Sequence, residues 1–338
     1  MRILIFSTVF APSVGGIQNL VRMLATDLVT LGQEVIVVTD TPAEEPNCLP
    51  FRVIRQPSLR EHIRVLRWCD VCHHHNISLK NLHPFLWRKK PLVVTHHGEY
   101  GRPNGHRGWQ DLLKLRVSRL TVNICCSGFV ARQLRKCVVI PNQYDSDTFE
   151  VLHQERSREL IFVGRLVSQK GCDTLLEALT ILKQHGLRPG LTIVGDGEER
   201  ARLMQVCADR ELGQQVTFVG ILGAPAIAEQ LNRHKILVVP SLRAEGFGIV
   251  ALEGLACGCL PIVSCHGGLT EAVGPHGLTF ENGDAAELAA RIGEALSGEG
   301  LISKKLRGVE AHLVQHERRH VARRYLDVYH EAARAAAV

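Results

Sequence analysis

The sequence has no long hydrophobic run and no strong bias in composition. No apolar stretch approaches the ~18 residues of a membrane-spanning helix, so we expect no transmembrane segment. Gly and Pro number 30 and 14 in 338 residues, which is ordinary usage and excludes collagen-like and low-complexity chains. The apolar start is followed by Pro12 and a glycine pair instead of a small-residue cleavage site, so we expect no signal peptide. This length and composition are typical of a globular protein with two domains.

Disulfide chemistry is not indicated either. The eleven cysteines are odd in number and evenly spread, which is typical of thiols in a reducing compartment, so we expect a cytoplasmic protein. One segment, Cys69-Asp70-Val71-Cys72-His73, spells the attachment pattern of c-type haem. It falls on a predicted strand and no distal ligand is evident, so we expect neither haem nor structural zinc there.

Positive charge is concentrated in one part of the chain. The whole sequence has a net charge of +6, but residues 51–136 alone carry 17 basic and 4 acidic side chains. Such an excess attracts anions. No zinc finger, aromatic ladder or recognition helix accompanies it, so we expect no nucleic-acid partner. A solvated basic face, a phosphorylated acceptor and an anionic membrane surface are all compatible with the pattern.

Three arginines of this segment, Arg60, Arg64 and Arg67, recur at intervals of four and three residues and are expected to share one helix face. With apolar, aromatic and basic neighbours they predict a face that touches an anionic membrane peripherally. These neighbours are Ile63, Leu66, Trp68, Trp87 and Arg88-Lys89-Lys90.

Short apolar runs alternate with helical periodicity throughout, which predicts the α/β class. Continuous apolar strands indicate parallel sheets covered by helices on both faces. The pattern occurs twice, so we predict two doubly wound, Rossmann-like domains facing a central cleft, residues 1–150 and 158–316. A polar stretch from Asn142 to Arg158 marks the boundary. A last helix, about 317–338, shows one apolar face that could pack on either domain; this face has Val321, Tyr325, Val328, Tyr329 and Ala332.

Open parallel sheets bind ligands at the carboxyl ends of their strands, so residues that directly follow a strand are the candidates for a site. After the predicted strand 160–163 comes the loop 164–171, which begins with Gly164 and holds two cations, Arg165 and Lys170. Two cations in a glycine-bounded loop before a helix can clamp a diphosphate. The alternative is a surface loop with two solvated charges.

Two carboxylates follow the predicted strand 236–239. Glu245 lies in the loop 240–248, and Glu253 lies one turn into the next helix, so both can point at one ligand. Gly246 and Gly248 expose backbone amides at the helix N-terminus. Because two carboxylates would repel a diphosphate, we expect them to accept hydrogen bonds from sugar hydroxyls.

Other strand ends give weaker signals. Glycines that let the backbone approach a ligand occur in three places, although plain turns give the same pattern. They are Gly195-Asp196-Gly197, Gly267-Gly268 and, before the first helix, Gly15-Gly16. His97, after the strand 92–94, is a candidate proton carrier or hydrogen-bond donor, with a structural histidine as the alternative. The segment 145–147, Asp-Ser-Asp, resembles a paired-aspartate metal site but is expected to be an ordinary linker turn.

Taken in order, these motifs resemble the retaining nucleotide-sugar glycosyltransferases of the GT-B fold, family 4, over essentially the whole length. The strongest match is Glu245-Gly246-Phe247-Gly248 with Glu253, the E-x7-E motif of that family. The loop with Arg165 and Lys170 matches the family's phosphate loop. Weaker matches in the same order are Gly15-Gly16, Thr95 with His97-Gly98, Ser127, Pro141-Asn142, Gly195-Asp196-Gly197 and Gly267-Gly268 with Glu271.

The resemblance implies a role for each matching residue. Arg165 and Lys170 would hold the donor diphosphate, Glu253 the ribose and Glu245 the transferred sugar. The segment from Gly246 through Phe247 and Gly248 to Ile249 would line the sugar and phosphate site with its amides. His97 would approach the sugar from the first, acceptor-binding domain, and Gly15 and Gly16 would lie near the phosphates. The last helix would cross back to the first domain.

The resemblance also implies a hexosyltransferase that needs no metal and no cofactor beyond its nucleotide-sugar donor, with UDP favoured over GDP. A lipid-linked glycan in polysaccharide biosynthesis is the expected acceptor. A departure from the family pattern is Gln143, where a glycine usually follows Pro-Asn. Two alternatives share the donor site: a sugar-nucleotide epimerase or hydrolase, and a non-catalytic nucleotide-sugar-binding partner.

Overall fold

The computed structural model describes residues 1–13, 15–43, 48–78, 90–101, 106–298 and 300–337. It separates into two compact units, each described here by itself. Residues 1–143 and 316–338 form the first, and residues 144–315 form the second. None of the described helices has the length and hydropathy needed to cross a membrane.

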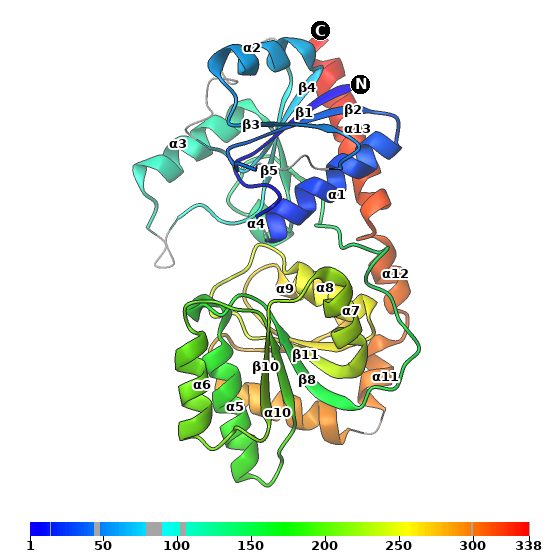
Figure 1. Ribbon diagram of the computed structural model, residues 1–338. Coiled ribbons are helices and arrows are strands. Elements are labelled where there is room, and N and C mark those ends of the chain that lie inside the picture. Colours follow the sequence, from blue (N-terminus) through cyan, green and yellow to red (C-terminus); the bar gives the residue numbers. More distant parts are fainter. Residues whose placement is uncertain (14, 44–47, 79–89, 102–105, 299, 338) are drawn as a thin grey trace. The chain divides into compact units, whose positions relative to one another are not determined.

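The first unit is built on a parallel sheet of seven strands in the order β3-β2-β1-β4-β5-β6-β7, with helices on both faces (Figure 1). Its apolar strands are buried, as continuous hydrophobic runs require. The strands are β1 (Arg2–Ser7), β2 (Glu34–Thr39), β3 (Arg52–Arg55), β4 (Val71–His75), β5 (Leu92–His96), β6 (Val122–Cys125) and β7 (Val138–Val139). The helices are α1 (Gly16–Thr30), α2 (Leu59–Trp68), α3 (Trp109–Val117), α4 (Gly128–Ala131) and α13 (Arg318–Ala337).

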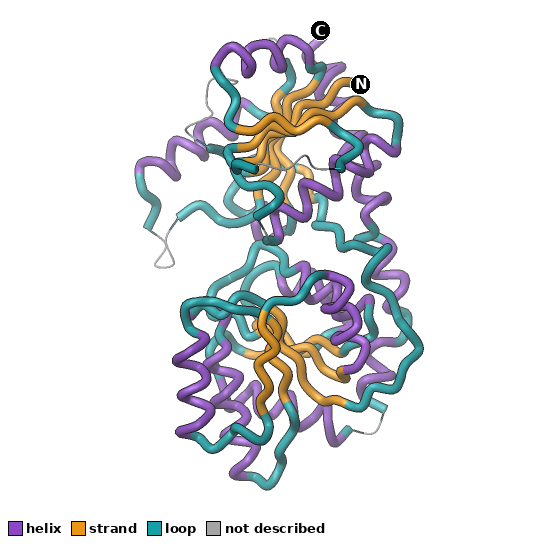
Figure 2. The backbone as a smooth tube through the Cα atoms, viewed as in Figure 1, coloured by secondary structure: helices purple, strands orange, loops and turns teal. Residues whose placement is uncertain are grey.

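The second unit repeats the plan with six parallel strands in the order β10-β9-β8-β11-β12-β13 (Figure 2). The strands are β8 (Arg158–Val163), β9 (Leu191–Val194), β10 (Val216–Gly220), β11 (His234–Val239), β12 (Leu260–Ser264) and β13 (Leu278–Phe280). The helices are α5 (Cys172–Gln184), α6 (Arg200–Asp209), α7 (Ala224–Arg233), α8 (Ile249–Ala256), α9 (Leu269–Val273), α10 (Ala285–Ser297), α11 (Leu301–Leu306) and α12 (Val309–Val314). Two doubly wound parallel sheets confirm the predicted fold class.

The predicted linker is not a free tether. The chain passes from the first unit to the second after Gln143, and most of the segment 142–158 belongs to the second unit. Asn232 of α7 accepts a hydrogen bond from the Leu152 amide at 2.8 Å and donates one to the Glu150 carbonyl at 2.9 Å. Arg156 donates to the carbonyl of His234 at 2.7 Å. These bonds attach the segment to α7 and β11.

The last helix, α13, packs on the first unit. Its predicted apolar face is buried with residues of α1 and the sheet in one core cluster. The Tyr329 hydroxyl bonds His73 Nδ1 of β4 at 2.8 Å, and Arg318 forms a largely buried ion pair with Asp27 of α1 at 2.9 Å. Apolar burial and specific polar contacts therefore both attach α13 to α1 and to the sheet of the first unit.

We expect Tyr329→Phe to lower the stability of the first unit by about 1–3 kcal/mol, because it leaves the buried His73 Nδ1 without its partner. All three tryptophans lie in the first unit, so their fluorescence during urea unfolding reports on it selectively. Tyr325→Phe is the matched control, since that hydroxyl meets Thr95 Oγ1 only at 3.3 Å. Equal losses in the two variants would contradict the importance of the Tyr329–His73 bond.

The structure corrects part of the predicted membrane face. Helix α2 starts with a capping box in which Ser58 and Glu61 bond each other's backbone, and Arg60, Arg64 and Arg67 are exposed along it. Leu66, however, is 3% exposed and belongs to the core cluster under β1 and β2, and Trp68 packs against this cluster. Three other predicted members, Trp87, Arg88 and Lys89, lie outside the described residues.

The haem-like segment is structural in the fold. Cys69 and Cys72 are buried in the same core cluster. His73 is buried and bonds Thr95 as well as Tyr329. All eleven cysteines are free thiols, and eight of them are buried.

Candidate functional site

The direction of chain progression changes between two neighbouring strands of the second unit. From β8 the chain continues to β9 and β10 on one side, and from β11 it continues to β12 and β13 on the other. The loops after β8 and β11 therefore leave the sheet side by side and turn in opposite directions. Open α/β sheets bind ligands at such a switch point, and both loops hold predicted site residues.

Lys170 and Glu245 meet at this switch point. Lys170 Nζ lies 2.8 Å from Glu245 Oε1, and both side chains are partly exposed, at 28% and 19%. The Ser241 hydroxyl bonds the same carboxylate oxygen. Lys170 and Glu245 are 75 residues apart, and the sheet order brings them together. A cation and a carboxylate side by side in a partly buried place can bind different groups of one ligand, the cation a phosphate and the carboxylate a sugar hydroxyl.

Backbone contacts fix this ion pair in place. Gly171 has a φ of +68°, and a Cβ there would lie 1.8 Å from the Pro240 carbonyl oxygen. Only glycine permits that approach. In addition, the Leu242 amide donates to the Gln169 carbonyl at 2.9 Å. The loop that holds Lys170 is thus joined to the loop that holds Glu245 by contacts on both sides of Lys170, at Gln169 and Gly171.

Arg165 lies at the start of the same loop as Lys170. It is exposed, and its guanidinium has no hydrogen-bond or ion-pair partner among the residues that the structure describes. A fixed loop with one paired and one unpaired cation attracts anions. A planar guanidinium can bind a phosphate through two parallel hydrogen bonds.

The glycines after β9 serve the packing of loops. Gly195 has a φ of +136°, and a Cβ there would lie 1.9 Å from the carbonyl oxygen of Gly164. A Cβ on Gly197 would lie 2.3 Å from the carbonyl oxygen of Leu166. The Leu166 amide also donates to the Asp196 carbonyl at 2.9 Å. The loop 195–199 therefore supports the loop that holds Arg165. The part of these glycines in donor binding stays a prediction from the family resemblance.

Helix α8 begins at the end of the Glu245 loop. Gly248 caps it at a φ of +96°, and a Cβ there would lie 2.3 Å from Leu269. Phe247 is buried, while Ile249 is half-buried and starts the helix, so its amide has no acceptor within α8. A Cβ on Gly268 would lie 2.2 Å from the carbonyl oxygen of Gly246. The loop after β12 therefore packs closely against the Glu245 loop.

Glu253 lies one turn into α8 and is half-buried. Burial, together with the smaller effect of the negative charge of Asp145, raises the pKa of its carboxyl to about 7. Asp145 itself forms the predicted turn, since its carbonyl accepts the amides of Thr148 and Phe149. The sequence did not reveal its influence on Glu253, because the two residues are neighbours only in the folded unit.

In the first unit, His97 follows β5 and is paired with another histidine. His97 Nε2 lies 2.8 Å from His75 Nδ1, with the two rings stacked, and the His97 amide donates to Asn76 Oδ1 at 3.0 Å. His97 Nδ1 is buried and has no partner among the described residues. Burial lowers the pKa of His97 to about 3, so the ring is neutral at physiological pH. A neutral hydrogen-bonding ring fits this environment, and a proton carrier does not.

The glycine pair before α1 has a simpler environment. Gly16 is the first residue of α1. Gly15 has an extended backbone, with a φ of 172°, and a Cβ there would meet only the flexible end of Gln18. The described part of this turn therefore gives no conformational reason for a glycine at position 15. Its neighbour Val14 lies outside the described residues.

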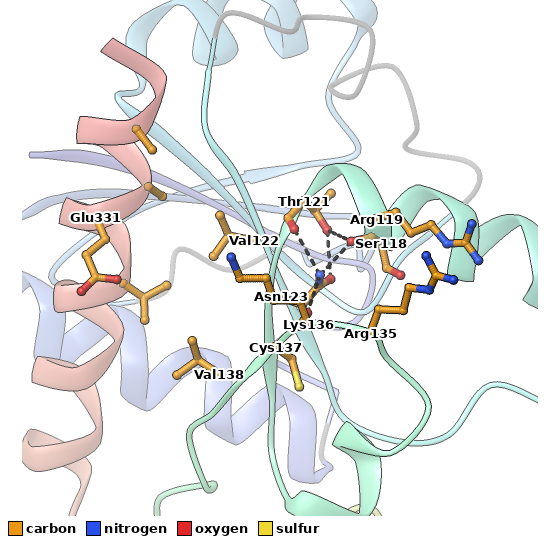
Figure 3. A pocket seen from close by; sticks show the side chains of 13 residues that line it. Ser118, Arg119, Thr121, Val122, Asn123, Arg135, Lys136, Cys137, Val138 and Glu331 are labelled. Carbon is orange, nitrogen blue, oxygen red and sulfur yellow. Dashed lines mark hydrogen bonds between the residues drawn. The ribbon is translucent and has the colours of Figure 1, made fainter. Parts of the chain in front are cut away.

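A separate cavity of about 570 Å³ lies in the first unit, between α13 and the edge strand β7 (Figure 3). Arg119, Arg135, Lys136 and Glu331 of α13 are among the residues that line it, and Figure 3 shows the two arginines on the side away from α13. None of the candidate catalytic or donor-binding residues named from the sequence lines it. The side chain of Asn123, which also lines the cavity, makes its hydrogen bonds within the protein, to His96 and to the carbonyls of Ser118 and Lys136.

Two family models match the chain. Glycosyltransferase Family 4 matches residues 14–147, and Glycosyl transferases group 1 matches residues 143–308. An uncharacterised glycosyltransferase of Methanocaldococcus jannaschii is 26% identical over 320 residues, covering 87% of this chain and 88% of the relative. The amylovoran biosynthesis glycosyltransferase AmsK of Erwinia amylovora is 29% identical, covering 79% of this chain and 65% of AmsK. Among solved structures, Anabaena HepE in complex with UDP and glucose has a TM-score of 0.80 at 20% identity, covering 98% of this chain and all of HepE.

Proposed function

Because the chain belongs to the family 4, group 1 glycosyltransferases and has their GT-B fold, we propose that it transfers a hexosyl unit from a nucleotide-diphosphate sugar to a hydroxyl acceptor with retention of configuration. The observation that carries the proposal is the Lys170–Glu245 pair at the switch point of the second unit, together with Arg165, which lies in the same loop as Lys170 and has no ion-pair partner among the described residues. It offers cations for a diphosphate and a carboxylate for sugar hydroxyls within one loop cluster.

Each residue of this cluster has a distinct task in the proposal. Arg165 and Lys170 bind the donor diphosphate, and Glu245 accepts hydrogen bonds from the transferred sugar. Glu253 accepts hydrogen bonds from the ribose hydroxyls. The amides from Gly246 to Ile249 add donors at the start of α8. For the first unit, roles of Gly15, Gly16 and His97 stay predictions from the family resemblance.

The proposed reaction breaks the bond between the anomeric carbon and the diphosphate oxygen. A bond from the acceptor oxygen to the same face of that carbon forms, and the acceptor proton passes to the leaving phosphate. Negative charge grows on the leaving diphosphate, where Lys170 and Arg165 stabilise it. Glu245 already bonds Lys170 and Ser241, which favours a binding role over that of a covalent nucleophile. Since two cations and helix amides supply this stabilisation, we propose that transfer needs no metal.

The relatives narrow the substrates of the proposal. HepE binds UDP and glucose, which favours a UDP-sugar donor over a GDP-sugar. AmsK acts in the biosynthesis of amylovoran, which favours a growing glycan as the acceptor. We propose a lipid-linked glycan, assembled in the cytoplasm during polysaccharide biosynthesis.

The test of the function is a product assay in buffer that contains EDTA. Panels of UDP-, GDP- and ADP-sugars are incubated with and without polyprenyl-diphosphate-linked glycans, and products are resolved by mass spectrometry. Acceptor-dependent sugar addition in EDTA is the expected result. Rapid donor turnover without an acceptor would favour the epimerase or hydrolase, and nucleotide binding without turnover would favour a non-catalytic partner. Activity that EDTA abolishes and manganese restores would refute metal independence.

Donor affinity should depend on pH through Glu253. Its pKa of about 7 means that the carboxylate, which accepts the ribose hydrogen bonds, is lost as the pH falls through 7. Between pH 8 and pH 6 the ionised fraction falls about tenfold, so UDP-glucose should bind up to about tenfold more weakly at pH 6. Isothermal titration calorimetry measures this directly.

Two variants make the pH dependence specific to this carboxyl. Glu253→Gln should bind weakly at both pH values, because it cannot ionise. Asp145→Asn should move the transition to lower pH, since Asp145 contributes to the raised pKa of Glu253. An equally steep pH dependence in Glu253→Gln would remove Glu253 from the ribose site.

The exposed arginines of α2 support a further proposal, peripheral contact with an anionic membrane where lipid-linked acceptors reside. With Leu66 buried, the contact rests on charge, at about 1 kcal/mol for each basic residue near the surface. We expect sedimentation with anionic liposomes at low salt and release at high salt. Replacing Arg60, Arg64 and Arg67 together by glutamine should abolish it. Equal pelleting of the triple variant and the wild type would contradict the proposal.

A further inference from the structure

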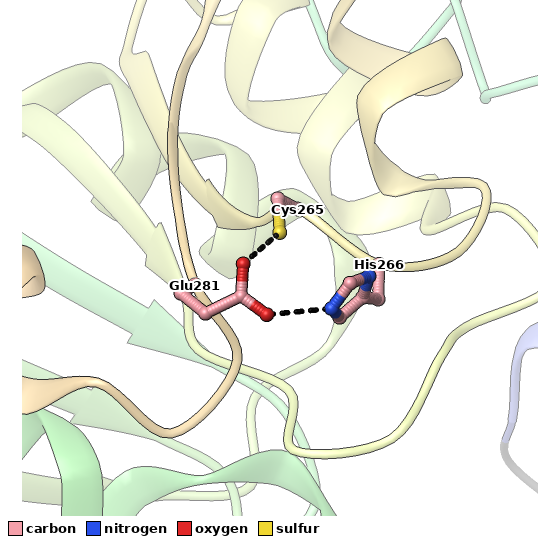
Figure 4. A group of neighbouring side chains, drawn as sticks. All are labelled: Cys265, His266 and Glu281. Carbon is pink, nitrogen blue, oxygen red and sulfur yellow. Dashed lines mark hydrogen bonds and ion pairs between the residues drawn. The ribbon is translucent and has the colours of Figure 1, made fainter.

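Three side chains with metal-binding atoms meet at the carboxyl ends of β12 and β13 (Figure 4). Cys265 and His266 directly follow β12, and Glu281 directly follows β13. The two strands are parallel neighbours, and the Cys265 amide donates to the Phe280 carbonyl at 2.8 Å, so the two strand ends leave the sheet together. The proposed transfer reaction uses none of the three residues.

The three side chains already converge in space. Glu281 Oε1 lies 2.6 Å from His266 Nε2, and Glu281 Oε2 accepts a hydrogen bond from Cys265 Sγ at 3.0 Å. All three candidate ligand atoms lie within 4.8 Å of one another. Zinc bond lengths of about 2.0–2.3 Å in tetrahedral geometry place ligand atoms about 3.3–3.7 Å apart. Small rotations of these side chains therefore suffice to receive an ion.

Neighbouring groups hold the backbone of both strand ends. The His266 amide donates to Asn282 Oδ1 at 3.0 Å, and the Glu281 amide donates to Glu287 Oε2 at 2.7 Å. Asn282 in turn donates to the Ser241 carbonyl at 2.9 Å. These bonds fix the backbone positions from which the ligand side chains extend. The ligand side chains themselves stay accessible, since those of His266 and Glu281 are 60% and 57% exposed.

We propose that Cys265, His266 and Glu281 bind a zinc ion, with its fourth position open to water. A thiolate, an imidazole and a carboxylate together suit zinc, whereas magnesium and calcium require oxygen ligands. On binding, the S–H bond of Cys265 breaks, a sulfur–zinc bond forms and the proton passes to solvent. Burial and the neighbouring Glu281 raise the pKa of the Cys265 thiol, so about one proton is released for each zinc ion near neutral pH.

The zinc site is separate from the proposed donor site but adjoins it. Gly267 and Gly268 follow His266 directly, and the Gly268 amide donates to the Glu245 carbonyl at 2.7 Å. None of the three ligands belongs to the proposed donor site, so the zinc proposal does not require that the chain transfer sugar. Its test accordingly uses spectroscopy and chemical labelling and no activity assay.

Cobalt(II) serves as the spectroscopic probe. Tag-free protein in a phosphine reductant is titrated with Co²⁺, and the expected result is one equivalent bound with a thiolate-to-cobalt charge-transfer band in the near ultraviolet, which Zn²⁺ abolishes. Cys265→Ser should lose the band, and His266→Ala should weaken Co²⁺ binding at least tenfold. Cys48→Ser is the matched control, because Cys48 is an exposed thiol in the first unit, and it should keep the band.

Alkylation of the wild-type protein gives a second readout that needs no variant. One equivalent of Zn²⁺ should slow iodoacetamide labelling of Cys265 at least tenfold, as followed by peptide mass spectrometry, and leave labelling of Cys48 unchanged. Three results would each overturn the proposal. They are the absence of a thiolate–cobalt band at one equivalent of Co²⁺, a band that persists in Cys265→Ser, and equal labelling of Cys265 with and without Zn²⁺.

Discussion

Lys170→Ala is expected to lower kcat/KM for sugar transfer by about a hundredfold or more, which corresponds to about 2.7 kcal/mol of lost transition-state stabilisation. A cation about 4 Å from a phosphate contributes about 4 kcal/mol at an effective dielectric constant of 20. The ion pair adds to the loss. In the wild type Lys170 Nζ lies 2.8 Å from the Glu245 carboxylate, and without Lys170 this carboxylate repels the leaving diphosphate.

The matched control for this variant is Lys183→Ala. Lys183 forms an ion pair of nearly the same length with Glu211, 2.9 Å, but in the last turn of α5, at the opposite end from the loop that holds Lys170. Its removal should leave kcat/KM unchanged. A folded Lys170→Ala protein with wild-type kinetics would exclude Lys170 from the donor site.

Arg165→Ala should also lower turnover about a hundredfold, but for a simpler reason. Arg165 has no partner among the described residues, so its removal breaks no ion pair and should not change the stability of the second unit. The whole effect should appear in kinetics, because a charge that faces the leaving diphosphate is lost. Arg165→Lys should be intermediate, since it keeps the charge but loses the planar pair of donors.

Arg188→Ala provides the comparison for Arg165. Arg188 is an exposed arginine that precedes β9, at the amino end of the sheet, and its removal should have no kinetic effect. Equal losses in Arg188→Ala and Arg165→Ala would indicate a general effect of net charge. That outcome would contradict a specific role for the loop after β8.

Much of the fold could be predicted from the sequence, because buried parallel strands need continuous apolar runs and their covering helices need one apolar face. The same reasoning located the loops with Arg165, Lys170 and Glu245 at strand ends. It could not show that Lys170 and Glu245 form an ion pair, since that depends on β8 and β11 being neighbours in the sheet. The order of strands is a property of the whole unit and has no local sequence signal.

The environments of other residues could not be predicted, for identifiable physical reasons. The sequence left Gly195 and Gly197 open as sites of ligand approach or as plain turns, and the atoms beside them are carbonyl oxygens of a neighbouring loop. Leu66 was assigned to a membrane-facing surface by its proximity to Arg67, yet it points into the core cluster. The sequence left His97 open as a proton carrier, a hydrogen-bond donor or a structural histidine, and its burial, which the sequence does not reveal, makes the ring neutral.

The most direct test of the account is hydrogen–deuterium exchange of the whole protein with and without UDP, GDP and ADP. The central claim is that the loops after β8 and β11 hold the donor diphosphate. At least one nucleotide should slow amide exchange in residues 164–171 and 240–253, and the effect should be lost in Lys170→Ala. If no nucleotide protects these loops, or if protection falls elsewhere and persists in Lys170→Ala, the proposed donor site is contradicted.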